Sequence, residues 1–99
     1  MTFDEFRASA RAEATPGDLL SDPLKALWYD ARGEWDRAHE IAQGLADSEG
    51  ARIHAYLHRK EGDRSNARYW YGRAGVEEVT GGLDQEWEAL VVRYLASGG

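Results

Sequence analysis

Apolar residues recur along the chain at the three- and four-residue spacing of amphipathic helices. Thr2 followed by Glu5 is a capping-box pattern and predicts the start of a first helix. The turn-forming segment 15–17 predicts where this helix ends. Its apolar face carries Phe3, Phe6 and Ala10.

Proline and glycine delimit the next two predicted helices. Asp22 followed by Pro23 is typical of an N-cap and the first helical position, and Gly33 predicts the end of this second helix. A third helix follows directly after the glycine. The apolar stripes of the two helices comprise Leu24, Leu27, Trp28 and Ala31, and then Trp35, Ala38, Ala42 and Leu45.

Three further helices are predicted in the second half of the chain. Ser48 can cap a fourth helix that runs to Gly62, and Asp63 can cap a fifth that ends near Ala74. After the glycines at 81 and 82, Asp84 can open a sixth helix. The apolar face of this last helix carries Leu83, Trp87, Leu90, Val91 and Tyr94. No segment shows convincing two-residue alternation, so the sequence predicts an all-α fold.

The predicted helices repeat with an offset of 29 residues, because Gly33-Glu34 and Ala38 match Gly62-Asp63 and Ala67. Apolar positions align at the same offset: Leu24 with Ile53, Trp28 with Leu57, Ile41 with Trp70, and Leu45 with Ala74. One helical hairpin cannot bury its apolar faces alone, so neighbouring hairpins stack. We therefore predict one domain, residues 1–99, of two stacked antiparallel hairpins. The first helix should pack on the first hairpin and the sixth helix on the second.

The repeated pattern resembles a tetratricopeptide repeat over residues 22–76. Its second unit carries Ala55, Gly62-Asp63, Ala67, Tyr71 and Ala74, and its first unit carries Ala26, Tyr29, Gly33-Glu34, Trp35, Ala38, Ala42 and Leu45. The offset is shorter than the usual ~34 residues of that family, so the link between hairpins must be short. The segments HAYLHRKEGD and NARYWYGRAG are also similar to those of a group of short bacterial proteins, which implies no activity. The tetratricopeptide resemblance implies an adaptor module that binds a protein or peptide.

Composition excludes several classes of function. The chain has no cysteine, which excludes disulfides and thiolate metal sites. Its formal net charge of −6 argues against nucleic acid as a partner. No segment has a signal-peptide pattern or approaches the ~20 apolar residues of a membrane span. We therefore expect a cytoplasmic protein that binds neither nucleic acid nor membrane, and we expect no cofactor.

The segment HAYLHRKEGD places His54 and His58 four residues apart, with Glu61 three residues further on. On a helix these side chains share about one-sixth of the circumference. Two histidines and a glutamate are a known catalytic zinc set. The familiar metallohydrolase helix, however, has a glutamate directly after its first histidine, where this chain has Ala55. His39, on the third helix, could join the pair across the turn.

Two interpretations of these histidines stay open. The tetratricopeptide register places His54 and His58 inside the hairpin, and we favour neutral packing histidines because nothing in the sequence fixes a third ligand. On this interpretation the protein holds no stoichiometric zinc. The alternative is a small-ligand or metal-dependent enzyme centred on His39, His54, His58 and Glu61. Its wider ligand cluster would add Asn66, Tyr69 and Arg73.

A basic face on the fourth helix is the main candidate binding surface. The tetratricopeptide resemblance implies that Arg52, Tyr56, Arg59 and Lys60 line a concave groove. The helical wheel independently places them opposite the histidines. Guanidinium groups bind carboxylates through paired hydrogen bonds, and tyrosine supplies stacking area. We therefore expect an acidic or C-terminal peptide as partner, although a charged face neutralised by nearby acids such as Glu49 is an equal alternative.

The aromatic content suggests a second kind of partner. Four tryptophans and five tyrosines exceed what so small a core can hide, so part of their surface should remain exposed. Large exposed apolar patches usually mark an interface. We expect a homodimer, with Trp87, Val91 and Tyr94 of the sixth helix as the main contributors.

Overall fold

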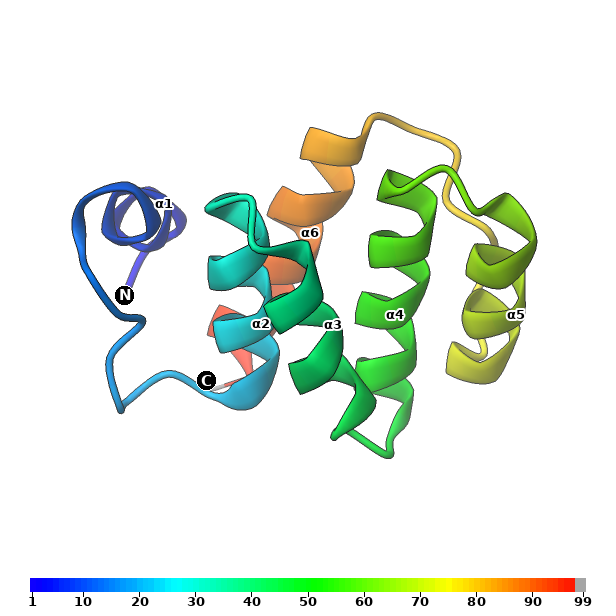
Figure 1. Ribbon diagram of the computed structural model, residues 1–99, viewed down its shortest axis with the longest axis horizontal. Coiled ribbons are helices and arrows are strands. Elements are labelled where there is room, and N and C mark those ends of the chain that lie inside the picture. The colour runs from blue at the N-terminus through cyan, green and yellow to red at the C-terminus, as the bar shows by residue number, and fades with distance from the viewer. Residues whose placement is uncertain (98–99) are drawn as a thin grey trace.

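The computed structural model describes residues 1–97, and these residues form six α-helices (Figure 1). The helices are α1 (Phe3–Ala12), α2 (Asp22–Ala31), α3 (Trp35–Gln43), α4 (Ser48–Lys60), α5 (Arg64–Ala74) and α6 (Leu83–Ala96). No strand occurs within this described part of the chain, which confirms the all-α prediction. None of its helices has the length and apolar character that crossing a membrane requires.

Helices α2 to α5 form the two predicted hairpins. Gly33 joins α2 to α3 and Gly62 joins α4 to α5, and both adopt positive φ angles of 80° and 88° that favour glycine. The second hairpin stacks on the first through contacts between α3 and α4 (Figure 1). The stacked hairpins are therefore confirmed.

Helix α6 packs on the second hairpin through α4, as predicted, and it also contacts α2 of the first hairpin and α1. Its buried residues Leu90, Val91 and Tyr94 belong to the main core together with Trp28 and Phe6. The segment between α5 and α6 contributes Val76 and Val79, which pack with Ala67 and Tyr71 of α5 in a second cluster.

Two residues expected at the surface of α6 are buried. Val91 and Tyr94 were predicted to contribute to a dimer interface, but Val91 is fully enclosed and Tyr94 donates a hydrogen bond to the Glu49 carbonyl at 3.2 Å. The exposed large apolar residue of α6 is Val92. The proposed surface is therefore wrong in these two residues, while the homodimer itself stays a prediction.

The helix ends follow the expected chemistry with small shifts. Thr2 and Glu5 form the predicted capping box, and Asp63 accepts a hydrogen bond from the Asn66 amide. The cap of α4 is Asp47 instead of Ser48, because its carboxylate accepts from the Gly50 amide at 3.0 Å. Helices α2 and α6 likewise begin one residue earlier than predicted, with Ser21 and Gly82 as their N-caps.

Gly50 sits where the loop between α3 and α4 crosses the first turn of α4. A Cβ at this position would overlap the carbonyl oxygen and the Cβ of Leu45. We expect Gly50→Ala to lower the free energy of unfolding by about 1–3 kcal/mol, because the loop must move away. Urea unfolding followed by circular dichroism measures the change.

Gly72 supplies the matched control for this prediction. It also lies within a helix, but an added Cβ would meet no atom within 4 Å. Gly72→Ala should therefore be neutral or raise stability by about 0.5–1 kcal/mol. Equal effects of the two substitutions would contradict the close approach at Gly50.

Candidate functional site

The three histidines of the chain converge on one site between α3 and α4. His39 comes from α3, and His54 and His58 lie one turn apart on α4. One ring nitrogen of each lies within 4.8 Å of the corresponding nitrogens of the other two. The ring of His39 meets those of His54 and His58 edge to face, with centroids 4.8 and 5.1 Å apart. The structure thus brings His39 to the predicted pair.

Two tryptophans flank this histidine cluster, which we define as His39, His54 and His58. Trp35 stacks on His39 at 4.8 Å and donates its indole N–H to the Leu57 carbonyl at 2.9 Å. Trp70 stacks on His54 at 4.0 Å with an interplanar angle of 9°. Because both indoles are packed against other helices, they hold the imidazole planes in fixed orientations.

Glu61 orients the third imidazole of the cluster. It is the C-cap residue of α4, and its carboxylate lies 2.6 Å from Nδ1 of His58. An ionised carboxylate can only accept a hydrogen bond, so Nδ1 of His58 is the donor in this contact. The exposed Asp63 also lies within 4.8 Å of the ligand atoms of His58 and Glu61.

Burial lowers the pKa of two members of the cluster, His54 and His39. His54 and His58 are 3% and 7% exposed, whereas His39 is partly exposed. Burial, and then the neighbouring His39 and His58, lower the pKa of His54 to about 4. Burial and then His58 also lower the pKa of His39. Neutral imidazoles can accept a hydrogen bond or donate a lone pair to a metal ion.

The outer members of the predicted ligand cluster lie further from the histidines. Tyr69 is 54% exposed, and its hydroxyl accepts a hydrogen bond from Arg73 at 3.0 Å. Both touch Trp70, which in turn stacks on His54. Asn66 bonds instead to Asp63 at the start of α5, so the structure links Tyr69 and Arg73 to the cluster only through Trp70.

The arginines of the predicted basic face of α4 pair with acids of the same chain. Arg59 donates to the buried carboxylate of Glu86 at 2.8 Å and to the Gly81 carbonyl. The same Glu86 accepts from the Tyr71 hydroxyl at 2.6 Å. Arg52 forms an ion pair with Glu49 at 3.5 Å. Open pockets nevertheless lie beside Arg59 and beside Arg52, so the binding surface expected from the repeat register stays a prediction.

Tyr56 and Lys60 of that face meet a buried acid of α2. Tyr56 is buried, and its hydroxyl donates to Asp30 at 2.7 Å. Lys60 donates to the other carboxylate oxygen of Asp30 at 2.9 Å. Burial and the Asp30 carboxylate raise the pKa of the Tyr56 phenol, which therefore stays a donor. The four predicted residues therefore have different partners: Arg52 pairs with Glu49, Arg59 pairs with Glu86, and Tyr56 and Lys60 both bond to Asp30.

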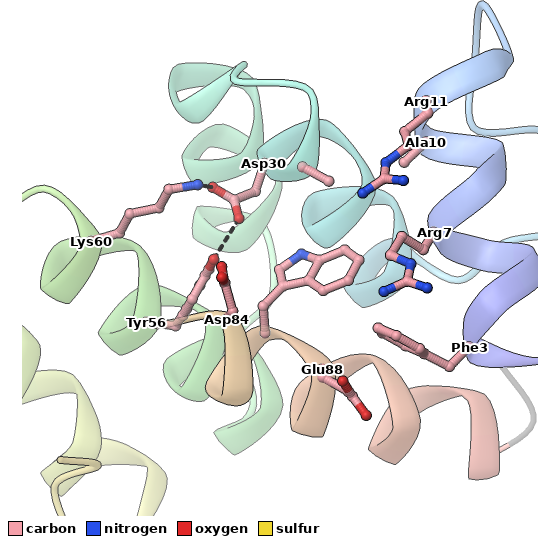
Figure 2. A pocket seen from close by; sticks show the side chains of 11 residues that line it. Phe3, Arg7, Ala10, Arg11, Asp30, Tyr56, Lys60, Asp84 and Glu88 are labelled. Atoms are coloured by element: carbon pink, nitrogen blue, oxygen red, sulfur yellow. Dashed lines mark hydrogen bonds and ion pairs between the residues drawn. The ribbon is translucent and has the colours of Figure 1, made fainter. Parts of the chain in front are cut away.

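Asp30, Tyr56 and Lys60 line an open cavity of about 330 Å³ between α1, α2, α4 and α6 (Figure 2). We call it the α1 cavity. Arg7 and Arg11 of α1 stand on one side of it, and Asp30, Tyr56 and Lys60 stand on the other (Figure 2). The remaining lining residues are Phe3, Ala10, Ala31, Asp84, Trp87 and Glu88. The place of Arg7 and Arg11 in this cavity was not predictable from the sequence, because nothing in their spacing indicates which helix α1 faces.

No known protein family, curated protein or solved structure matches the chain. The class of the protein therefore rests on its architecture. Residues 1–97 form an all-α domain of six helices, in which two stacked hairpins carry a histidine cluster and a cavity of mixed charge.

Proposed function

We propose that the protein is an adaptor module that binds a peptide, or an extended segment of a partner protein, through the α1 cavity. The observation that carries this proposal is the arrangement of the lining residues. Two guanidinium groups of α1 face a tyrosine, a lysine and a buried carboxylate across an open cavity of about 330 Å³ (Figure 2). A cavity of this volume can hold one or two residues of a bound peptide.

The cations of the cavity suit a carboxylate of the ligand. Arg11 makes no ion pair with residues 1–97, and Arg7 shares only an exposed pair with Asp4 at 3.2 Å. A guanidinium group can bind a carboxylate through two parallel hydrogen bonds, and this contact favours binding when the carboxylate replaces water in a partly enclosed site. The side chains of Arg7 and Arg11 are therefore proposed to bind an acidic side chain or the C-terminus of the peptide.

Other lining residues of the cavity can contact the backbone and the apolar side chains of a peptide. Asp84 and Glu88 of α6 line the cavity and can accept hydrogen bonds from peptide N–H groups. Phe3 and Trp87 meet edge to face at 5.6 Å and supply an aromatic wall. Trp87 is held in place because its indole N–H donates to the Leu27 carbonyl at 3.1 Å. Acceptors, cations and an aromatic wall together match the groups that a peptide presents.

The stacked hairpins give independent support. They resemble tetratricopeptide repeats, whose concave groove commonly binds extended peptides or helices. In this chain α6 packs against both α2 and α4. The α1 cavity is lined by Tyr56 and Lys60 but not by Arg52 or Arg59, so the proposed peptide site includes two of the four residues predicted on the basic face.

A peptide titration tests the proposal. Acidic peptides with free C-termini, and their C-terminally amidated forms, are titrated against the wild-type protein and an Arg7→Ala, Arg11→Ala double variant. We expect binding that weakens at least tenfold in the double variant and weakens as salt increases, since screening reduces the attraction. Fluorescence anisotropy of labelled peptides measures the dissociation constant.

The matched control removes two arginines elsewhere. Arg64 and Arg68 of α5 are exposed and pair with Glu78 at 2.9 and 3.1 Å, away from the α1 cavity. The Arg64→Ala, Arg68→Ala variant should bind as the wild type does. Equal binding by the two double variants, or no binding by any of the three proteins, would overturn the proposal.

A further inference from the structure

We infer that His39, His54 and His58 together form a binding site for one divalent transition-metal ion, with Zn²⁺ as the best match. The inference rests on the convergence of all three histidines of the chain on one position between α3 and α4. It goes beyond the proposed peptide binding and uses none of the residues that line the α1 cavity.

The donor set and its spacing fit such an ion. Three neutral imidazoles are a known ligand set for zinc with an open fourth position. In a tetrahedral zinc site with Zn–N bonds of about 2.0–2.1 Å, the ligand nitrogens lie about 3.3 Å apart. The nitrogens of the cluster lie within 4.8 Å of one another, so binding requires them to approach by at most about 1.5 Å. The partly exposed His39 can make this movement by rotating its side chain.

The surroundings prepare the ligands for a metal. Zinc-bound histidines usually donate their second N–H to a carboxylate or a carbonyl, which fixes the ring and raises its basicity. Glu61 does this for His58, because its carboxylate lies 2.6 Å from Nδ1 and leaves Nε2 as the metal ligand. Trp35 and Trp70 hold the planes of His39 and His54 by stacking. Glu61 is therefore a positioning residue.

The contact of His58 with Glu61 distinguishes a metal site from simple packing. Three rings that only fill space do not need a carboxylate aimed at one of them, whereas the Glu61 carboxylate lies 2.6 Å from Nδ1 of His58.

One member of the cluster is partly open to solvent, since His39 is partly exposed whereas His54 and His58 are buried. Three protein ligands leave the fourth position of a tetrahedral ion free, which distinguishes metal sites that bind a further ligand from closed structural ones. This inference reverses the expectation drawn from the sequence, where the absence of a third ligand favoured packing histidines.

Zinc titration of the chelator-stripped protein tests the site. After treatment with EDTA and dialysis, isothermal titration calorimetry with Zn²⁺ should show one ion per chain with a submicromolar dissociation constant. The melting temperature should rise by several degrees in excess zinc, because the ion binds the folded state selectively. Mg²⁺, which prefers oxygen ligands, should produce neither effect.

Three variants decide whether the histidine cluster is the site. His39→Phe keeps an aromatic ring against Trp35 but removes one ligand, and it should weaken zinc binding at least 100-fold. Glu61→Gln should weaken it about 10–100-fold, as expected for a carboxylate behind a ligand. Glu40→Gln, which removes an exposed carboxylate beside His39, should leave the affinity unchanged.

Several results would overturn the inference. One is a wild-type protein, folded by circular dichroism, that binds no zinc. Another is a His39→Phe variant that binds zinc as tightly as the wild type. The Arg7→Ala, Arg11→Ala variant should bind zinc normally, so failure of the metal site is distinguishable from failure of the proposed peptide site.

Discussion

Replacing Trp28 by alanine should lower the free energy of unfolding by about 3–5 kcal/mol. Trp28 is fully buried in the main core. Its indole N–H donates to the Ser9 hydroxyl of α1 at 3.1 Å, and the guanidinium group of Arg32 lies over its ring at 4.7 Å. The substitution removes these contacts and leaves a cavity between α1 and α2. Since a domain of this size has a total stability of only about 5–15 kcal/mol, the loss is large.

Chemical denaturation of the variant measures this loss, and Tyr69→Ala is its control. Tyr69 is also an aromatic residue on a helix, but it is 54% exposed. Its removal should change stability by less than about 0.5 kcal/mol. A Trp28→Ala variant with a loss below about 1 kcal/mol would show that the core does not depend on this side chain.

Asp30→Ala should produce the second large effect, a loss of about 2–4 kcal/mol. The buried carboxylate of Asp30 accepts hydrogen bonds from Tyr56 at 2.7 Å and from Lys60 at 2.9 Å. Without it, the Tyr56 hydroxyl remains buried with no acceptor. Lys60 is partly exposed and can return to water, which keeps the loss below that of a fully buried ion pair.

A double-mutant cycle with Tyr56→Phe isolates the coupling. Tyr56→Phe alone should cost about 1 kcal/mol, because Asp30 keeps its contact with Lys60. In the double variant no hydroxyl is left unsatisfied, so its loss should be smaller than the sum of the single losses by about 1 kcal/mol. Strictly additive losses would mean that the two side chains are not coupled.

The local features of the fold were predictable because they depend on neighbouring residues. The capping box at Thr2, the cap at Asp63 and the glycine turns at Gly33 and Gly62 all occur as the sequence indicates. The contacts of α6 with α1 and α2 were not predictable, because an apolar stripe shows that a helix packs but not on which partner. Because these packing partners of α6 were not predictable, the burial of Val91 was not predictable either.

The candidate sites likewise have some features that follow from the sequence and others that depend on tertiary contacts. The pairing of His54 and His58 follows from helical spacing, and the stacked hairpins bring His39 beside them. The α1 cavity combines residues from four helices that are far apart in the sequence, so no local pattern indicates it. The burial of Tyr56 likewise depends on tertiary contacts, since the helical wheel of α4 shows only which side of the helix it occupies.

The contact of α6 with α1 brings the first and last helices of the chain together. In an open array of repeats, each unit touches only its neighbours, and the ends can fray independently. Here α6 contacts α1, α2 and α4, so opening any of these three helices also breaks contacts of α6. The domain should therefore unfold as one cooperative unit, and no single hairpin is expected to persist without the rest of the chain.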